Sequence, residues 1–298
     1  MRFTPPTRTQ QLAAIGPTAG LPGPLRRALE PRDDFQAIPD PGPGDWLVNH
    51  PEAGQTFEQF VRSRPNRPDE RRKVLYLQPL GDFRESERPS LDQLRQFTAA
   101  FFMMGVRVLP PLDLNKARIT KRRNPGSGQV QLLTSDILTL LRHRLPEDCF
   151  ALVGVTMIDL YPDPSWNFVF GQASPSDRVS VYSFPRYDPR FYGQAAPPDL
   201  RKLMLRHSTK VLAHETGHMF GLEHCVWYRC LMNGSNHLAE SDARPPRLCP
   251  VDLRKLQWSI RFDVAERYRG LRDVHRQVEF EDEAQWLDKR IRFIASHD

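Results

Sequence analysis

The sequence predicts an α/β fold in which a mixed, twisted β-sheet packs against helices. Three observations carry this prediction. Between residues 73 and 161, short apolar runs rich in β-forming residues alternate with amphipathic helical stretches. Residues 149–161, CFALVGVTMIDLY, are apolar almost throughout, which is typical of a strand buried on both faces. Residues 166–174 and 178–184 are two further short runs joined by a turn, and they predict a hairpin that gives the sheet an antiparallel edge.

The elements before this hairpin are expected in the order strand, helix, strand, helix, strand. The first strand is KVLYLQPL at residues 73–80, and the second is VRVLPPL at residues 106–112. A helix is expected between them at residues 90–104, because this stretch begins with a serine N-cap, has apolar residues at helical spacing and is followed by glycine. A second helix is expected at residues 131–144, ahead of the long apolar strand.

The second half of the chain is predicted to be largely helical. Residues 199–221 form the longest helical stretch, with Asp199 as its N-cap and Gly221 at its end. Regular periodicity fades over residues 222–247. Closing helices are expected at residues 252–260, 264–274 and 279–298.

The first 70 residues, called the lead segment below, are rich in proline and weakly periodic. PDPGPGDW at residues 39–46 is a turn-rich stretch that is incompatible with a helix or a central strand. A short helix is expected at residues 56–61, and no other regular structure is predicted. The chain therefore divides into a proline-rich extension (1–70), a subdomain with the mixed sheet and the longest helix (71–221) and a smaller C-terminal subdomain (222–298).

Composition argues against several classes of protein. The chain has no run of about 18 or more apolar residues, so no membrane helix is expected. Its first residues lack the apolar core of a secretory signal, so we expect a cytoplasmic protein in which the four cysteines do not form a disulfide framework. The net charge of +6 comes from bases interleaved with acids. The densest basic run, RITKRR at residues 118–123, has no aromatic residues for base stacking, and nucleic-acid binding is not expected.

The string HETGHMFGLEH has the spacing of a metal site. His214 and His218 are four residues apart, so on a helix they lie on the same face and can bind one ion. Glu215 is rotated about 100° around the helix axis and can reach a water held by that ion. Gly221 can adopt a positive φ and turn the chain, which brings His224 back as a third ligand. Three protein ligands with an open fourth position are typical of a catalytic zinc.

This arrangement predicts a zinc-dependent peptidase that acts on peptides or proteins. Three neutral imidazoles leave the zinc its full charge, which activates a water for attack on a peptide carbonyl. Glu215 accepts the proton of that water and can return it to the leaving amine. The alternative is a zinc-holding binding or regulatory protein that cleaves little. Glu215 favours the enzyme, because a pure binding site has no need for this carboxylate.

The pattern HExxHxxGxxH, followed shortly by a methionine, resembles the metzincin clan of zinc metallopeptidases. Within that clan, HETGHMFGLEHC with the CxM that follows resembles the archaemetzincins. The resemblance covers residues 73–260 and implies a metzincin-like zincin fold, with an active-site helix and with Met232 as a hydrophobic floor beneath the three imidazoles. It also implies a second, structural zinc bound by cysteines, because Cys225, Cys230 and Cys249 match the family pattern.

One position departs from that pattern, because Asp252 stands where the family has its fourth cysteine. An aspartate keeps the negative charge of a thiolate and can bind zinc, but it is a harder ligand, so weaker zinc retention is expected. The alternative is that the three cysteines are buried, reduced thiols and that Asp252 is the N-cap of the following helix.

Three other residues and one predicted strand are expected to lie outside the set of metal ligands. Cys149 is expected to be a small core residue, and His207, one heptad before His214, a supporting or core histidine. His237 is assigned no role. By the same resemblance, residues 166–174 are expected to form a rim strand that aligns an extended substrate.

Overall fold

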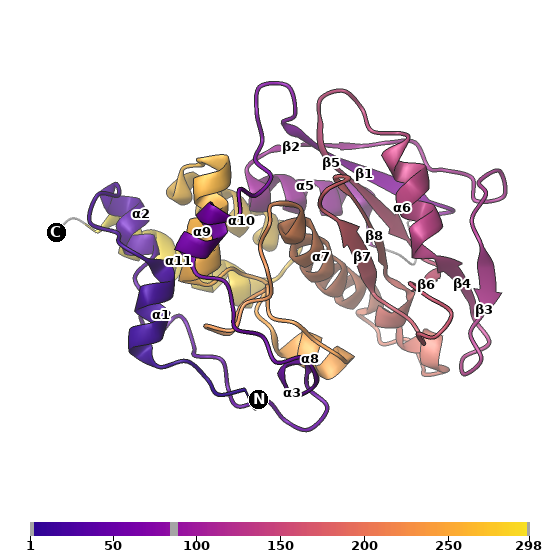
Figure 1. Cartoon of the computed structure of the whole chain (residues 1–298), viewed down its shortest axis with the longest axis horizontal. Coiled ribbons are helices and arrows are strands. Elements are labelled where there is room, and N and C mark those ends of the chain that lie inside the picture. Colours follow the sequence, from indigo (N-terminus) through magenta and orange to yellow (C-terminus); the bar gives the residue numbers. More distant parts are fainter. Residues whose placement is uncertain (1–2, 84–88, 297–298) are drawn as a thin grey trace. The chain divides into compact units, whose positions relative to one another are not determined.

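The structure is a computed structural model that describes residues 3–83 and 89–296 (Figure 1). The chain forms two compact units. The sheet unit comprises Arg67–Ala99 and Met104–Met219. The helical unit comprises the residues up to Asn66, the short piece Ala100–Met103 and the residues from Phe220 onward.

The main sheet of the sheet unit is mixed, as the sequence predicts. Its five strands lie in the order β2-β1-β5-β8-β7. The inner pairs are parallel, and β7 runs antiparallel to β8 at the edge. The strands are β1 (Val74–Leu80), β2 (Gly105–Val108), β5 (Cys149–Thr156), β7 (Gly171–Ser174) and β8 (Val179–Ser183).

A second, three-stranded sheet in the order β3-β4-β6 is not foreseen from the sequence. Its strands are β3 (Lys121–Arg123), β4 (Val130–Leu133) and β6 (Asp159–Tyr161). The prediction of one strand over residues 149–161 is therefore wrong, because β5 ends at Thr156 and β6 belongs to the other sheet. The Thr156 hydroxyl donates to the carbonyl of Leu80 and accepts from the amide of Ile158, which turns the chain out of the main sheet.

Several other predicted elements are shorter than expected. The strand predicted at residues 106–112, for example, ends at Val108 as β2. The helix α6 (Thr134–Arg142) begins three residues later than predicted, because the residues before it pair in β4. The expected strand over residues 166–174 is ordered only as β7. Asn167 lies in its first half, where its carbonyl accepts hydrogen bonds from the side chains of Arg122, Asn124 and Gln131. The only strand pairing described in this half is a single antiparallel bridge between Val169 and Leu160.

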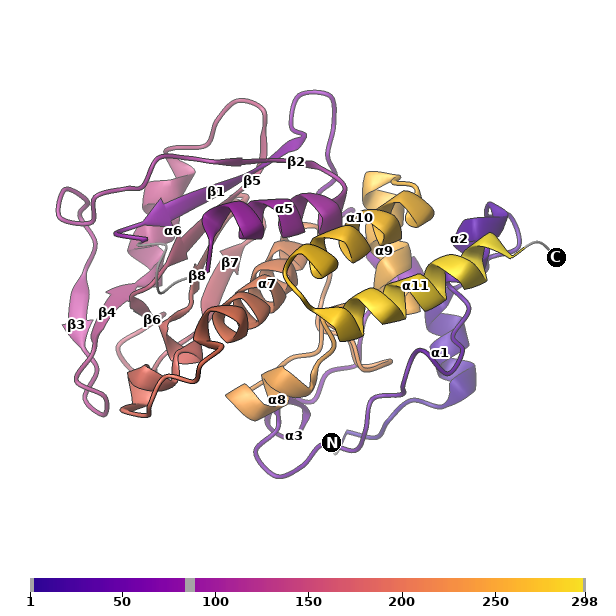
Figure 2. The same ribbon diagram turned by 180° about the vertical axis from the view of Figure 1, so that it is seen from behind.

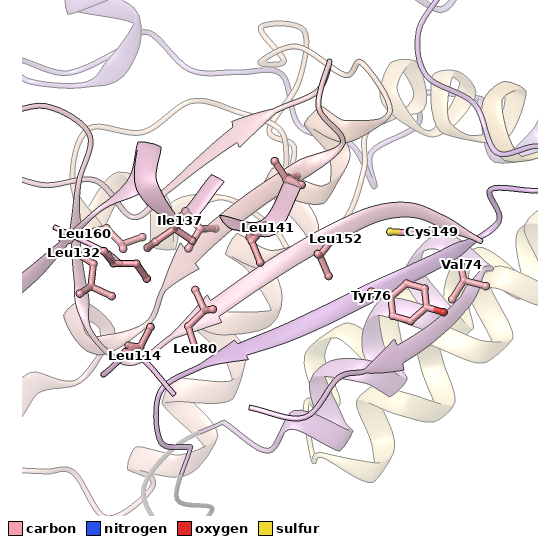
Figure 3. Packing of buried hydrophobic residues seen from close by; sticks show 13 residues of the cluster. Val74, Tyr76, Leu80, Leu114, Leu132, Ile137, Leu141, Cys149, Leu152 and Leu160 are labelled. Atoms are coloured by element: carbon pink, nitrogen blue, oxygen red, sulfur yellow. The ribbon is translucent and has the colours of Figure 1, made fainter. Parts of the chain in front are cut away.

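The core of the sheet unit lies between the main sheet and α6 (Figure 3). Tyr76, Leu152 and Val179 are paired neighbours on β1, β5 and β8, so their side chains share one face of the sheet. Ile137 and Leu141 of α6 complete this buried cluster. The opposite face is covered by α5 (Leu91–Phe102) and α7 (Leu200–Met219), as Figure 2 shows. Two 3-10 turns, η1 (Pro185–Tyr187) and η2 (Pro189–Tyr192), connect β8 to α7.

The helical unit contains eight named helices among the described residues. They are α1 (Arg8–Ile15), α2 (Gly23–Ala28), α3 (Trp46–Asn49), α4 (Phe57–Arg62), α8 (Leu238–Ala243), α9 (Pro250–Ile260), α10 (Val264–Gln277) and α11 (Glu281–Ala295). The predicted short helix at residues 56–61 is confirmed as α4. The last two residues of the predicted tail helix, 297–298, lie outside the described residues.

The lead segment is more regular than its composition suggests. Three helices, α1 to α3, form where none is predicted. The helices α1 and α4 each begin with a capping box, in which Thr7 pairs with Gln10 and Thr56 with Gln59. These reciprocal bonds satisfy amide groups that a short helix would otherwise leave open. Across the described residues, no helix is both long and apolar enough to pass through a membrane.

Candidate metal centres

The helix α7 provides two nitrogen donors from one face. His214 and His218 are one turn apart, and their Nε2 atoms are 3.3 Å from each other. The two rings are nearly perpendicular, with an interplanar angle of 87°. His214 is buried, with 4% of its surface exposed, while His218 is partly exposed. Two ring nitrogens at this separation are directed to a common point and can share one cation.

Glu215 lies between these histidines on α7 and is partly exposed. Tyr182 of β8, in the same unit, responds to its charge. Burial raises the pKa of the Tyr182 phenol well above its usual value, and the negative charge of Glu215 raises it further. The carboxylate of Glu215 is therefore near enough to β8 for its charge to act on Tyr182.

The chain turns sharply at Gly221, two residues after α7 ends. Gly221 has φ of 80°, a conformation that side chains disfavour. A Cβ at this position would lie 2.7 Å from Cβ of Pro65, so space also excludes a side chain. Both constraints require glycine at the start of the irregular loop that carries His224.

His224 is held by the lead segment. Its Nδ1 atom lies 2.9 Å from Oε1 of Glu52, although 172 positions separate the two residues. The same oxygen accepts a hydrogen bond from Nε1 of Trp46 at 2.9 Å. The Trp46 ring meets the His224 ring edge to face, with centroids 4.9 Å apart. A carboxylate acceptor at Nδ1 favours the tautomer that leaves the Nε2 lone pair available to a metal.

The charge of Glu52 is stabilised in place. Burial of its carboxyl favours the neutral form, but hydrogen bonds from His224 and Trp46 outweigh this effect and hold its pKa below the usual value. Its second oxygen, Oε2, is buried and has no hydrogen-bond partner among the described residues. Glu52 is therefore an anion directed at His224 by one oxygen.

A second candidate centre lies wholly within the helical unit. Cys225, Cys230, Cys249 and Asp252 are all buried, and one ligand atom from each lies within 4.8 Å of the others. The Sγ atoms of Cys225 and Cys249 are 3.6 Å apart, and Oδ2 of Asp252 is 3.3 Å from Sγ of Cys230. Three sulfurs and one carboxylate oxygen form a donor set that suits a tetrahedral zinc.

Asp252 does not cap α9. The N-cap is Cys249 and the helix begins at Pro250, so Asp252 lies in the first turn with its side chain directed inward. The capping role that the alternative gives to Asp252 is therefore wrong, while its three buried, reduced thiols stay a prediction. Its Oδ1 atom lies 2.9 Å from Nζ of Lys255, which is also buried. Burial and the charge of Cys225 raise the pKa of Asp252 to about 6, while Lys255 opposes that rise.

The three thiols are not equivalent. Burial raises the pKa of the Cys225 thiol, but hydrogen bonds from Cys230 and Cys249 and the charge of Lys255 bring it well below the usual value. Burial together with the neighbouring sulfur Cys225 raises the pKa of the other two thiols. Cys225 is thus the sulfur that most readily carries negative charge.

Asn233 shapes the loop that carries these cysteines. Its Nδ2 atom donates to the carbonyls of Cys225 and Tyr228, at 2.7 and 2.9 Å, and its Oδ1 accepts from the amide of Cys230 at 2.7 Å. The loop is closed by the amide of Cys225, which donates to the carbonyl of Met232 at 2.8 Å. Met232 itself is fully buried.

Comparison with known proteins identifies the family. A model of peptidase family M54 matches residues 115–258. The chain is 40% identical over 276 residues to Archaemetzincin-2 of Macaca fascicularis, an alignment that covers 83% of this chain and 76% of that protein. The chain belongs to the archaemetzincin family. Members of this family are zinc metallopeptidases, so the protein is a zinc-dependent hydrolase of peptides or proteins.

Other similar proteins are archaemetzincins or peptidases. Archaemetzincin-1 of Homo sapiens is 37% identical over 254 residues, which cover 76% of this chain and 51% of that protein. The crystal structure of archaemetzincin from Methanopyrus kandleri is 28% identical, with a TM-score of 0.49, and covers 65% of this chain and 99% of its own. A zinc-dependent peptidase from Methanocorpusculum labreanum is 25% identical with the same TM-score, and covers 61% of this chain and 99% of its own.

A third group of acidic and histidine side chains is explained without a metal. Asp45, His237 and Glu240 lie close enough to share a cation. However, Nε2 of His237 is bonded to Asp45 at 3.0 Å, and its Nδ1 accepts from the Glu240 amide at 3.2 Å. The two carboxylate oxygens of Glu240 accept from the amides of Trp46 and Asn236. This group braces the loop before α8, and His237 is its exposed N-cap.

Reasoning from sequence missed four residues of the two centres. Glu52 and Trp46 lie in the lead segment, where no motif marks them. Asn233 and Lys255 could have been found from the residues next to them in the sequence. Asn233 follows the CxM motif directly, and Lys255 is three residues after Asp252 on a predicted helix, where opposite charges meet.

The remaining predictions concern residues of the sheet unit. Cys149 is a buried, free cysteine at the start of β5, as expected for a core residue. His207 is buried and stacks on Tyr187, with ring centroids 4.9 Å apart, so it supports the packing of α7 as predicted.

Proposed function

We propose that the protein hydrolyses peptide bonds with one zinc held by His214, His218 and His224 and with Glu215 as the general base. The observation that carries the proposal is the 3.3 Å approach of Nε2 of His214 to Nε2 of His218. A turn at Gly221 and a third histidine follow within six residues of this pair. That third imidazole already has its Nδ1 atom paired with a carboxylate.

The donor set fits zinc. Neutral imidazoles are common zinc ligands, and three of them leave one position for a reactant. When bound, zinc supplies a Lewis acid that polarises a peptide carbonyl and acidifies a water molecule. The histidines of α7 need no induced rearrangement to offer their nitrogens, because the helix already holds them one turn apart.

Glu215 is suited to move the protons of the reaction. It follows His214 directly, so its carboxylate is carried by the same turn of α7 but is rotated away from the two nitrogen donors. Its partial exposure lets water and substrate reach it. In the proposed reaction the carboxylate takes a proton from the attacking water and delivers it to the leaving amine.

We further propose a metzincin-like arrangement around this centre. In it α7 is the active-site helix, and the sheet and helical units correspond to the N-terminal and C-terminal subdomains. Met232, buried in the loop after His224, would provide the apolar floor. The edge strand β7 pairs with β8 on one side only among the described residues, so its other side offers backbone groups to an extended peptide.

A second, structural zinc is proposed at Cys225, Cys230, Cys249 and Asp252. The four ligand atoms converge in the core of the helical unit, and the site has no room for a reactant because all four residues are buried. Closed coordination by protein ligands is typical of zinc that stabilises a fold. Lys255 accounts for the replacement of the fourth cysteine, since it holds one oxygen of Asp252 and leaves the other for the metal.

The test is cleavage of a broad peptide library by the zinc-loaded protein and by Glu215→Ala. We expect the variant to keep its zinc and to lose activity by about 100-fold or more, as the loss of a general base predicts. Glu223→Ala is the matched control, because Glu223 is an exposed carboxylate of the same string.

Two results would contradict the proposal. Equal cleavage by the wild type and Glu215→Ala would exclude Glu215 as the base. An absence of cleavage by a fully zinc-loaded wild type would favour the zinc-holding regulatory protein instead.

A further inference from the structure

We propose that Glu52 is a positioning residue that orients His224 for zinc, so that the lead segment completes the catalytic metal centre. The inference rests on the proposed three-histidine site and extends it to a part of the chain that precedes the family match at residues 115–258. The observation behind it is the 2.9 Å contact between Oε1 of Glu52 and Nδ1 of His224.

His224 needs such a partner more than the other two histidines do. His214 and His218 are fixed by the backbone of α7. His224 lies in the irregular stretch 222–226, which has no helix or strand to fix its side chain. An imidazole in such a loop can rotate and change tautomer. A carboxylate at Nδ1 removes both freedoms and makes Nε2 a better donor to a metal.

The carboxylate of Glu52 is itself held in position by Trp46. The indole Nε1 donates to the same oxygen that faces His224. The indole ring packs closely on Gly234, where an added Cβ would lie 2.4 Å from it. The backbone amide of Trp46 donates to Glu240 at 2.8 Å. Trp46 is therefore fixed on two sides, and it holds Glu52 against His224.

The backbone near Glu52 is anchored to both ends of the same loop. The side-chain amide of Gln55 donates to the carbonyl of Gly221 at 3.2 Å, and Nε1 of Trp227 donates to the carbonyl of Gln55 at 3.2 Å. The contact between Glu52 and His224 lies between these two bonds. Residues 52–55 thus brace residues 221–227 at three points, which is more than an isolated surface ion pair would provide.

The pair has a carboxylate–histidine geometry that elsewhere tunes bound metals. Loss of such a partner typically weakens metal affinity by about 10–100-fold. If Glu52 only stabilised the fold, its removal would lower the unfolding temperature without changing the affinity of the folded protein for metal. The two roles can therefore be separated by measuring affinity in the folded state.

The experiment is a Co²⁺ titration of the metal-free full chain, followed by competition with Zn²⁺. Cobalt bound by three imidazoles gives visible d–d bands, whereas cobalt bound by thiolates adds sulfur-to-metal charge transfer, so the two centres are read separately. We expect Glu52→Gln to bind metal at the histidine centre about 10–100-fold more weakly and at the cysteine centre as the wild type does.

Two further variants sharpen the result. Glu58→Gln, at an exposed glutamate of α4 paired with Arg62, should leave both affinities unchanged. Trp46→Phe removes one donor to Glu52 but keeps the carboxylate, so it should weaken the histidine centre less than Glu52→Gln does. If Glu52→Gln folds poorly, the metal affinity of Trp46→Phe still tests the role of Glu52.

Unchanged affinity at the histidine centre in both Glu52→Gln and Trp46→Phe would overturn the inference while leaving the proposed function intact. A wild type without any imidazole-type cobalt spectrum would instead overturn the proposed three-histidine site, and the role of Glu52 with it.

Discussion

Nζ of Lys255 lies 2.9 Å from Oδ1 of Asp252, and the two side chains are 1% and 0% exposed. This buried pair adjoins three cysteine sulfurs. In the proposed second zinc site, three thiolates and one carboxylate would carry four negative charges, of which the zinc would offset two and Lys255 a third. In the proposed site the lysine would therefore make an aspartate acceptable as the fourth ligand, because a buried carboxylate without a partner is costly.

The first prediction concerns the number of zinc ions. Cys230→Ser should lose one zinc per chain, since a serine hydroxyl is a poor zinc ligand at neutral pH, and the catalytic zinc should remain. Cys149→Ala removes a buried cysteine outside the cluster and should keep the wild-type zinc content. Metal analysis after gel filtration measures both. Equal zinc content in the wild type and Cys230→Ser would exclude the second site.

The second prediction concerns the strength of that site. Asp252→Cys replaces a hard oxygen ligand with a soft sulfur, so zinc should be retained more firmly. Zinc release can be followed with a chromogenic chelator under conditions that leave the protein folded. The variant should release its second zinc more slowly than the wild type does. Faster release would mean that the carboxylate and Lys255 together hold the ion better than a fourth thiolate.

The third prediction concerns the turn after α7. Gly221→Ala should lower the free energy of unfolding by about 1–2 kcal/mol for its positive φ and by about 1–3 kcal/mol more for the overlap with Pro65. Gly44 also has a positive φ, but no atom lies within 4 Å of an added Cβ. Gly44→Ala should therefore lower the free energy of unfolding only by the about 1–2 kcal/mol that the positive φ accounts for. Denaturant unfolding measures both variants. If both lose the same free energy of unfolding, the close contact between Gly221 and Pro65 does not add to the loss at Gly221.

The fourth prediction concerns acid stability of the helical unit. Burial opposes ionisation of Asp34, but hydrogen bonds from Lys289 and Arg290 outweigh it and lower its pKa. The side chain of Arg290 is fully buried. Because the folded pKa lies below the unfolded value of about 3.9, the stabilisation is complete above that pH and is lost as the pH falls through the folded pKa.

Asp34→Asn should therefore destabilise the protein at pH 7, by about 3 kcal/mol, as the loss of one partner of a buried ion pair predicts. The difference from the wild type should shrink as the pH falls below about 4. Unfolding by urea at several pH values measures this. Asp69→Asn, at an exposed pair with Arg72, is the control and should show little change. A difference that stays constant down to pH 2 would contradict the assignment.

The sequence was sufficient for the parts of the two centres that are local in the chain. His214 and His218 are placed by helical spacing alone, and Cys225 and Cys230 by a pattern of a few residues. Glu52 could not be found in this way, because a single glutamate in a proline-rich stretch has no periodicity and its partner is 172 positions away. Only the folded lead segment brings them together.

The fold was predicted well where the chain is regular and less well where strands are short. The parallel strands and α7 follow from long apolar or helical patterns. The change of sheet after Thr156 is hidden within a continuous apolar run, because both strands are buried and the turn depends on one hydroxyl group. The three-residue strands β3 and β6 are too short for an alternating pattern to emerge.

The most direct test of the central claim is anomalous diffraction at the zinc edge from crystals of the zinc-loaded protein. We predict a peak about 2.0–2.1 Å from one nitrogen of each of His214, His218 and His224, with no fourth protein ligand. For His224 that nitrogen should be Nε2, with Nδ1 facing Glu52. A zinc ion that is not coordinated by one of these imidazoles, or that has a fourth protein side chain as a ligand, would contradict the claim.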